Sequence, residues 1–328
     1  MLAGAQNNLG VDYALEGRFK DARNAYAKAL DAYGVPTETN QFRYGAGRAT
    51  VLVNLGSLDA HVGDSLQAER DYEGAIELYR QLCKQNRRFV SELPIPLNAL
   101  GWLYLSNGNK VEGRKKLEEA ADKSRQVAKE NPEAYSPDLA MTVNDLALFY
   151  AQDPETATKA DAVYKEAMNA ARTLAQEQPV VYGWVFGKIA QNAGDFYTDS
   201  KRYKDANEAY LEALPILQKL AEDKKVDSLE DLGSILTSLA VLWYEQGKQG
   251  PETSQMIQSL KYTNGALDVG RHLIPTDPVK YGDRIADGLF RKIDILRTLN
   301  APCEEIVKAA DEADRVSLTR LQRNRRKR

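Results

Sequence analysis

The sequence predicts an all-α protein of about seven antiparallel helix pairs stacked into an α-α superhelix. A small residue that follows Leu or Ala recurs at positions 10, 56, 101, 147, 194 and 240 of the 328 residues, so the chain repeats about every 46 residues. Large apolar residues recur every three or four positions, which is the period of an amphipathic helix. β-Branched residues are sparse, and no stretch alternates with period two. A single pair cannot bury its apolar face, so neighbouring pairs are expected to stack.

The first repeat carries the full pattern, and the later repeats keep its spacing. Its marked positions are Leu9, Gly10, Tyr13, Gly17, Phe19, Ala22, Tyr26 and Ala29. The fourth repeat has one extra residue in its turn, and the sixth has about seven around Gly250-Pro251. The predicted repeats span about 1–40, 41–90, 91–134, 135–179, 180–226 and 227–275. A degenerate helix pair over 276–319 and a basic tail over 320–328 follow.

Glycine and proline predict where the helices end or bend. A glycine precedes the second helix in four repeats, at Gly17, Gly63, Gly108 and Gly247. Glycine adopts the left-handed conformation of a helix C-terminus at little cost, so each is expected there. Pro215 lies inside the second helix of the fifth repeat, where it removes a hydrogen bond and predicts a kink. Only eight residues precede Leu9, so the first helix is expected to look truncated.

The motif L-G-x-x-Y…G-x-[FY]-x-x-A-x-x-x-Y-x-x-A resembles the tetratricopeptide repeat (TPR). The usual TPR has about 34 residues, and the surplus here lengthens both helices. The segment 144–150 is similar to the kinesin-light-chain class of TPR, and 131–139 resembles the inter-repeat loop of long bacterial TPR arrays. The resemblance implies a single TPR solenoid over 1–328, with a concave groove lined by the first helix of each pair.

The groove positions implied by the resemblance are rich in asparagine. They lie at −6, −3, −2, +1, +4 and +5 from Gly10 and its equivalents. The −3 and −2 positions are Asn7-Asn8, Val53-Asn54, Asn98-Ala99, Asn144-Asp145, Gln191-Asn192 and Thr237-Ser238. Half of these twelve are Asn, although Asn makes up 17 of 328 residues. An amide donates and accepts at once, which suits one peptide unit of an extended ligand. Alternatively, these amides bond to neighbouring helices or simply follow the repeat consensus.

The remaining groove positions differ along the chain. Trp102, with Leu105, Met141 and Leu148, predicts an apolar patch of the kind found at binding hot spots, unless Trp102 is buried between repeats. Packing between helices explains the aromatic stretch 182–186 more simply than ligand contact. The candidate residues for a peptide or partner groove are Asn8, Asn54, Asn98, Trp102, Asn144, Asp145, Leu148, Lys188, Asn192, Asp195 and Tyr244. Only Lys188 is basic at the positions that would clamp a carboxylate, so a two-carboxylate clamp is disfavoured.

Composition excludes several function classes. The longest apolar runs are far shorter than the roughly 18 residues of a membrane span. Two Cys and two His cannot form a disulfide framework and leave little for a metal site, and no phosphate-binding or catalytic motif occurs. We therefore expect no enzyme activity and no cofactor. With no signal peptide at the N-terminus, we expect a cytoplasmic location, although an N-terminal truncation would remove such a signal.

The net charge of −3 divides into an acidic body and a basic tail. Residues 320–328 contain six Lys or Arg and no acid, and the rest carries −9. Such a block can bind nucleic acid or anionic lipid, but favourable charge at a helix C-terminus explains it more simply. The leading hypothesis is a non-enzymatic scaffold that binds a peptide segment or partner helix in the TPR groove. The alternative is a sensor or oligomerisation arm of a larger signalling protein. The sequence does not predict the oligomeric state.

Overall fold

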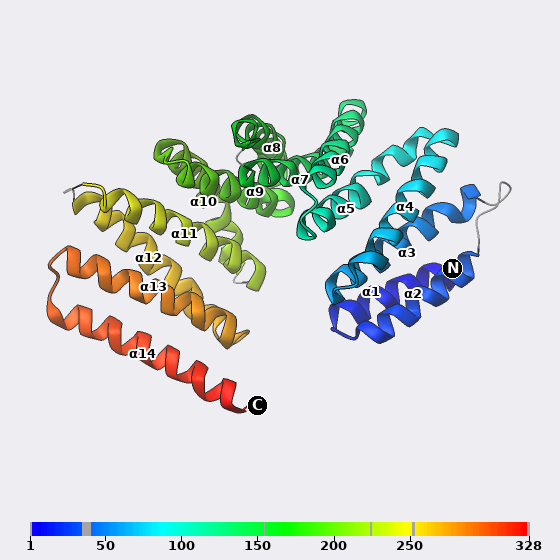
Figure 1. Cartoon of the computed structure of the whole chain (residues 1–328). Helices are drawn as coiled ribbons and strands as arrows, with labels where there is room; N and C mark the ends of the chain where they lie inside the picture. Colours follow the sequence, from blue (N-terminus) through cyan, green and yellow to red (C-terminus); the bar gives the residue numbers. More distant parts are fainter. Residues whose placement is uncertain (1, 35–40, 154, 224, 251–252, 327–328) are drawn as a thin grey trace. The chain divides into compact units, whose positions relative to one another are not determined.

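The computed structural model describes residues 2–34, 41–153, 155–223, 225–250 and 253–326, and this part of the chain contains α-helices, two short 3-10 helices and no strand. The α-helices follow one another as seven antiparallel pairs, which confirms the predicted fold class (Figure 1). They are α1 (Leu2–Leu15), α2 (Phe19–Tyr33), α3 (Gln41–Val62), α4 (Ser65–Gln85), α5 (Pro94–Ser106), α6 (Lys110–Glu130), α7 (Pro132–Gln152), α8 (Ala157–Glu177), α9 (Pro179–Asp199), α10 (Tyr203–Leu220), α11 (Val226–Gly247), α12 (Thr253–Leu273), α13 (Pro278–Thr298) and α14 (Cys303–Arg326).

The chain divides into two compact units, Met1–Val163 and Tyr164–Arg328. In the first unit α1 packs with α2, α3 with α4 and α5 with α6, and α1 also contacts α3, α3 contacts α5, and α5 contacts α7. In the second unit α9 contacts α11 in the same way. We call these first helices of each pair the odd-helix layer. The single domain predicted over 1–328 stays a prediction.

The recurring small residue is explained by one contact within each pair. The Tyr72 ring of α4 packs directly on Gly56 of α3, where a Cβ atom would lie 2.8 Å from the ring. Tyr26 packs on Gly10 and Tyr210 on Gly194 in the same way. The spacing between the small residue and the later tyrosine therefore records the closest approach of two helices. Since interiors are close-packed, neither side can change alone.

The turns confirm three of the four glycine predictions. Gly63 has a φ of 88°, and Gly17 and Gly108 are also left-handed. Gly247 lies at a helix C-terminus as expected, but the left-handed conformation predicted for it is wrong, because it remains the last helical residue of α11 and packs on the side chain of Met256. The longer turn of the sixth repeat begins after it. In the fifth repeat, Lys201 takes the left-handed position with a φ of 57°.

Prolines lie at the first position of α5 and of α7. Pro94 is the first residue of α5, which follows a 3-10 helix over Arg87–Glu92 and has only 13 residues. The loop expected over 131–139 is wrong, because α7 begins at Pro132 and continues through Pro137. A proline in the first turn costs no intrahelical hydrogen bond. α10 is likewise continuous from Tyr203 to Leu220 through Pro215.

Side chains of the odd helices also bond to the second helix of the preceding pair. The Tyr104 hydroxyl of α5 donates to Glu69 of α4 at 2.8 Å, and the Tyr150 hydroxyl of α7 donates to Glu118 of α6 at 2.7 Å. In α3 the equivalent residue is Asp59, which is fully buried and pairs with Arg23 of α2. Where this position carries aspartate in place of tyrosine, the facing helix therefore carries arginine in place of glutamate.

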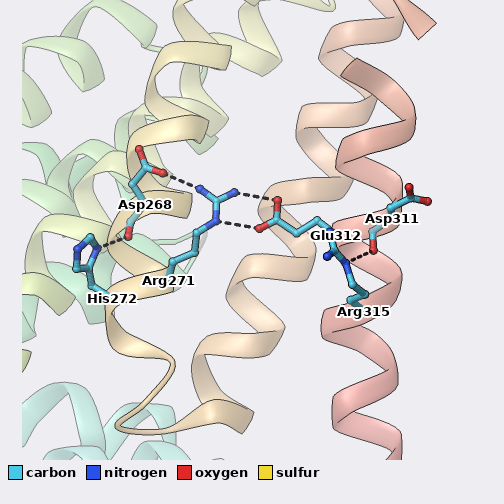
Figure 2. Close-up of polar contacts among 6 residues, drawn as sticks. All are labelled: Asp268, Arg271, His272, Asp311, Glu312 and Arg315. Atoms are coloured by element: carbon cyan, nitrogen blue, oxygen red, sulfur yellow. Dashed lines mark hydrogen bonds and ion pairs between the residues drawn. The ribbon is translucent and has the colours of Figure 1, made fainter. Parts of the chain in front are cut away.

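Ion pairs join consecutive second helices. Arg80 of α4 contacts Glu119 of α6 at 2.7 Å. In the second unit, Arg271 of α12 makes two bonds to Glu312 of α14, at 2.8 and 3.0 Å, and a third to Asp268 at 2.6 Å (Figure 2). These pairs are partly exposed, so each contributes about 0–1 kcal/mol to stability.

Candidate functional site

The first unit has a hollow between α1, α2 and α3, with a volume of about 460 Å³. Six of its ten lining residues stand at positions predicted to face the groove: Val11, Ala14, Leu15, Asn54, Ser57 and His61. We call it the α1–α3 hollow. Leu15 is 83% exposed, and the His61 ring lies 4.9 Å from that of Phe19. The hollow combines an apolar wall with polar groups from α3, which suits one apolar side chain beside a peptide backbone.

Two of the predicted groove amides form a hydrogen bond to a neighbouring repeat. The Asn54 side chain donates to the Oδ1 atom of Asn7 at 2.9 Å, and that of Asn98 donates to the Oδ2 atom of Asp145 at 2.6 Å. Both bonds join the −3 position of one repeat to the −2 position of the next. Between them, the same two positions hold Val53 and Ala99, which pack on a common apolar cluster. These amides therefore stabilise the stacking of neighbouring pairs.

Asp145 is the centre of a polar cluster in the first unit. Burial raises the pKa of its carboxyl group, and hydrogen bonding from Asn98, Asn144 and Trp102 opposes the rise. Asn144 is only 2% exposed, whereas Trp102 and Leu148 are half-buried. The structure thus brings Asn98, Trp102, Asn144 and Asp145 together. Asn8 is exposed and lies apart from this cluster, on α1.

In the second unit, Asp195 accepts hydrogen bonds from both layers. The Tyr210 hydroxyl of α10 donates to it at 2.6 Å and the Ser238 hydroxyl of α11 at 2.9 Å. Surrounding protein atoms displace water and raise the pKa of Asp195, and the nearby charge of Lys188 lowers it. Lys188 itself is exposed and Asn192 is half-buried. Asp195 therefore joins α9, α10 and α11 besides presenting charge to solvent.

Tyr244 lies on α11 and its hydroxyl donates to Asp294 of α13. Burial, together with the bond to this carboxylate, raises the pKa of Tyr244 to about 12. The phenol thus stays protonated at physiological pH. It bridges two odd-numbered helices, as the amides do in the first unit.

A second cavity, of about 260 Å³, lies between α11, α12 and α13, and we call it the α11–α13 pocket. Gln191, Ser234, Thr237 and Ser238 line it from positions predicted to face the groove. Sequence reasoning missed the charged residues that the last helix pair contributes, Arg284, Asp287 and Arg291, because that pair lacks the repeat signature. The sequence did contain a signal for this site, because Arg284 and Arg291 are seven residues apart and so lie on one face of a helix.

Trp184 is a further residue that sequence reasoning assigned differently. Val185 and Phe186 are buried, as helix packing predicts, but Trp184 is 47% exposed. It precedes Lys188 by four residues, so the two side chains lie on one face of α9. An exposed Trp next to a charged residue belongs with the candidate binding residues of the second unit.

Several other features were searched for across the described residues. No group of three or more His, Cys, Asp or Glu side chains is placed to hold a metal ion in that part of the chain. None of its helices is long and apolar enough to cross a bilayer. The backbone of α14 continues to Arg326, but the side chains of the basic tail over 320–328 lie outside the described residues.

The helix pairs, their small-residue contacts and their stacking define an α-helical repeat protein whose fold is similar to that of TPR proteins. Residues 2–34 match the family model described as Tetratricopeptide repeat. This match and the structural neighbours confirm the resemblance that the motif suggested. No curated protein sequence matches the chain.

Solved structures of other repeat proteins share the fold. BtubC (BKLC) from P. vanneervenii is 17% identical, with a TM-score of 0.59, over 76% of this chain and 90% of that one. A putative kinesin light chain from Podosopora anserina, with nearly identical TPR-like repeats, is 15% identical, with a TM-score of 0.50, over 66% and 96%. Nro1, described as a nuclear import adaptor, is 12% identical, with a TM-score of 0.51, over 92% and 93%. At these identities the likeness concerns the fold alone. Repeat folds of this type typically serve as non-catalytic interaction scaffolds.

Proposed function

We propose that this protein is a non-enzymatic scaffold that binds a peptide segment or a partner helix along its odd-helix layer. One observation carries the proposal: each unit has a cavity lined by first helices, and the predicted groove positions contribute to both. Nro1, which has a similar fold and is described as a nuclear import adaptor, agrees with such a role for the fold. Solenoids commonly bind extended partners on the face formed by the first helices of their repeats.

The bonded amides retain the chemistry needed to bind a peptide. The Asn54–Asn7 bond uses one donor and one acceptor. The Nδ2 atom of Asn7 and the Oδ1 atom of Asn54 have no hydrogen-bond partner among the described residues. The pair therefore still offers one donor and one acceptor, which match the carbonyl and N–H of one peptide unit. Stacking of repeats and ligand binding are compatible roles for these asparagines.

A selection from a phage-displayed library of random twelve-residue peptides tests the proposal. Enriched peptides are then measured by fluorescence anisotropy against Leu15→Glu and Trp184→Glu, which alter exposed residues of α1 and α9. Leu66→Glu is the matched control, because Leu66 is 60% exposed on α4, outside the odd-helix layer. We expect each peptide to lose at least about tenfold in affinity with one of the first two variants and to bind the control normally, as removal of a hot-spot contact does. The proposal fails if no peptide is enriched, or if only Leu66→Glu weakens binding.

The proposal also places the protein in the cytoplasm. Cys83 and Cys303 are both free thiols, and Cys303 is exposed. Exposed thiols persist in reducing compartments. Fractionation of cells that express the protein with a small C-terminal tag tests this location, and recovery outside the cytoplasmic fraction would contradict it.

A further inference from the structure

The α11–α13 pocket is too small for most drug-sized ligands, whose sites measure about 300–1,000 Å³. Its volume of about 260 Å³ suits a single side chain. Two glycines of its lining are closely packed: a Cβ atom at Gly288 would lie 2.9 Å from Leu267, and one at Gly270 would lie 2.9 Å from Ile285. A larger residue at either position would therefore crowd the side chains of Leu267 and Ile285.

A buried hydroxyl lines this pocket without a partner. Thr263 is 0% exposed, and its Oγ1 atom has no hydrogen-bond partner among the described residues. Thr237, which lines the same pocket, instead donates to the carbonyl of Gly233 at 2.8 Å, as helical threonines often do. An unpaired buried hydroxyl is destabilising, because it has lost its hydrogen bonds to water without replacement. A ligand that accepts a hydrogen bond from Thr263 would recover part of this cost.

Two guanidinium groups line the pocket without ion pairs. Burial lowers the pKa of Arg291, which is half-buried and makes no ion pair or hydrogen bond within the described part of the chain. Arg284 stands 5.8 Å from the Tyr281 ring and also lacks an ion pair there. Asp287 is the single carboxylate in the lining. The pocket therefore has an excess of positive charge in an acidic chain.

The second helices of the same unit contain an arginine whose guanidinium group is paired with carboxylates. Arg271 is bonded by Glu312 and Asp268 on α14 and α12 (Figure 2). Arg291 is more buried than Arg271, and the charges of Asp287 and Glu245 act on it only at a distance, without an ion pair or hydrogen bond among the described residues. An arginine fork is complementary to the two oxygens of a carboxylate. The group missing from the pocket is thus an anionic, hydrogen-bond-accepting one.

From these observations we propose that the α11–α13 pocket binds one acidic side chain, Asp or Glu, of a peptide lying along the odd-helix layer. Arg291 pairs with the carboxylate and Thr263 donates a hydrogen bond to it. Gln191, Thr237 and Ser238 stand on the odd-helix side of the pocket, where the peptide backbone passes. This inference rests on the proposed function and gives it a sequence preference.

The peptide selection is repeated with wild type, with Arg291→Gln, and with the control Arg297→Gln, an exposed arginine of α13 outside the pocket. We expect peptides enriched by wild type and by the control to share an acidic residue at a fixed position, and those enriched by Arg291→Gln to lack it. If wild type enriches no peptide, the proposed function itself fails. If it enriches peptides without an acidic preference, or if Arg291→Gln keeps the preference, only the pocket assignment is overturned.

Affinity measurements on one enriched peptide complete the test. An analogue of this peptide with Glu replaced by Gln should bind wild type about tenfold more weakly than the parent peptide does. The two peptides should bind Arg291→Gln equally well, because this variant lacks the positive charge that would pair with the Glu. Thr263→Val should weaken the parent peptide severalfold and melt no lower than wild type, since the hydroxyl it removes is unpaired. Equal effects of Glu→Gln on wild type and Arg291→Gln would refute the pairing. Stabilisation of wild type by free glutarate or phosphate, with no peptide preference, would refute a peptide as the source of the anion.

Discussion

Asn98→Ala separates the structural role of the asparagines from their proposed role in binding. The substitution removes a 2.6 Å hydrogen bond to Asp145. A hydrogen bond to a charged group contributes about 1.5–3 kcal/mol. Alanine recovers up to about 0.7 kcal/mol of helix propensity, and the loss of the Oδ1 atom, which is buried without a partner, offsets a little more. The net loss of unfolding free energy should be about 1–2 kcal/mol.

Urea unfolding followed by circular dichroism at pH 7 measures this loss. Asn8→Ala is the matched control, because Asn8 is exposed in α1 and its removal should change stability by less than about 0.5 kcal/mol. The loss at Asn98 should shrink at a pH low enough to protonate Asp145, whose pKa is raised. If both variants unfold like wild type, the Asn98 bond does not stabilise the stacking, and the interpretation of these amides as contacts between repeats is wrong.

Three further predictions concern packing, pH and surface charge. Gly56→Ala should destabilise the protein by about 1 kcal/mol, because an overpacking cost of about 1–3 kcal/mol exceeds the gain in helix propensity. Gly74→Ala should instead stabilise it by about 0.5–1 kcal/mol, because the added Cβ atom there makes only an ordinary contact. Burial raises the pKa of Asp71 to about 6, so its contribution to stability is present below about pH 4 and is lost as the pH rises through 6. Asp71→Asn should remove this pH dependence of the unfolding free energy, which is on the order of 3 kcal/mol. Arg271→Gln should cost less than about 1 kcal/mol, although it breaks the bonds to Glu312.

Each of these results has a contradicting outcome in the same urea titrations. Equal stability of the two alanine variants would show that Tyr72 does not require a glycine opposite it. An unchanged pH profile between pH 4 and 7 for Asp71→Asn would show that this carboxyl group titrates normally. A loss above about 2 kcal/mol for Arg271→Gln would mean that its ion pairs are more than surface contacts.

The helix pairs could be predicted because the features that define them are local and repeated. Gly56 and Tyr72 lie 16 residues apart and meet within one pair, so their spacing recurs wherever the contact does. Two residues are exceptions to the predicted helix ends. Gly247 and Pro132 resemble turn residues, but Gly247 is the last residue of α11 and Pro132 is the first residue of α7.

The candidate site was predicted less completely, because its contacts join residues of different repeats. The enrichment in Asn at the −3 and −2 positions was visible, but the pairing of Asn7 with Asn54 requires the stacking geometry. The unpaired state of Arg291 depends on which side chains α11 and α12 place opposite it. No local pattern in residues 278–298 records this.

Hydrogen exchange of the protein with and without a selected peptide tests the central claim most directly. Binding along the odd-helix layer predicts slower exchange in segments of α1 and α3, or of α11 and α13, because ligand contact stabilises the helices it touches. The second helices α4, α6, α10 and α12 should change less. Protection confined to those second helices, with the first helices unchanged, would contradict the account.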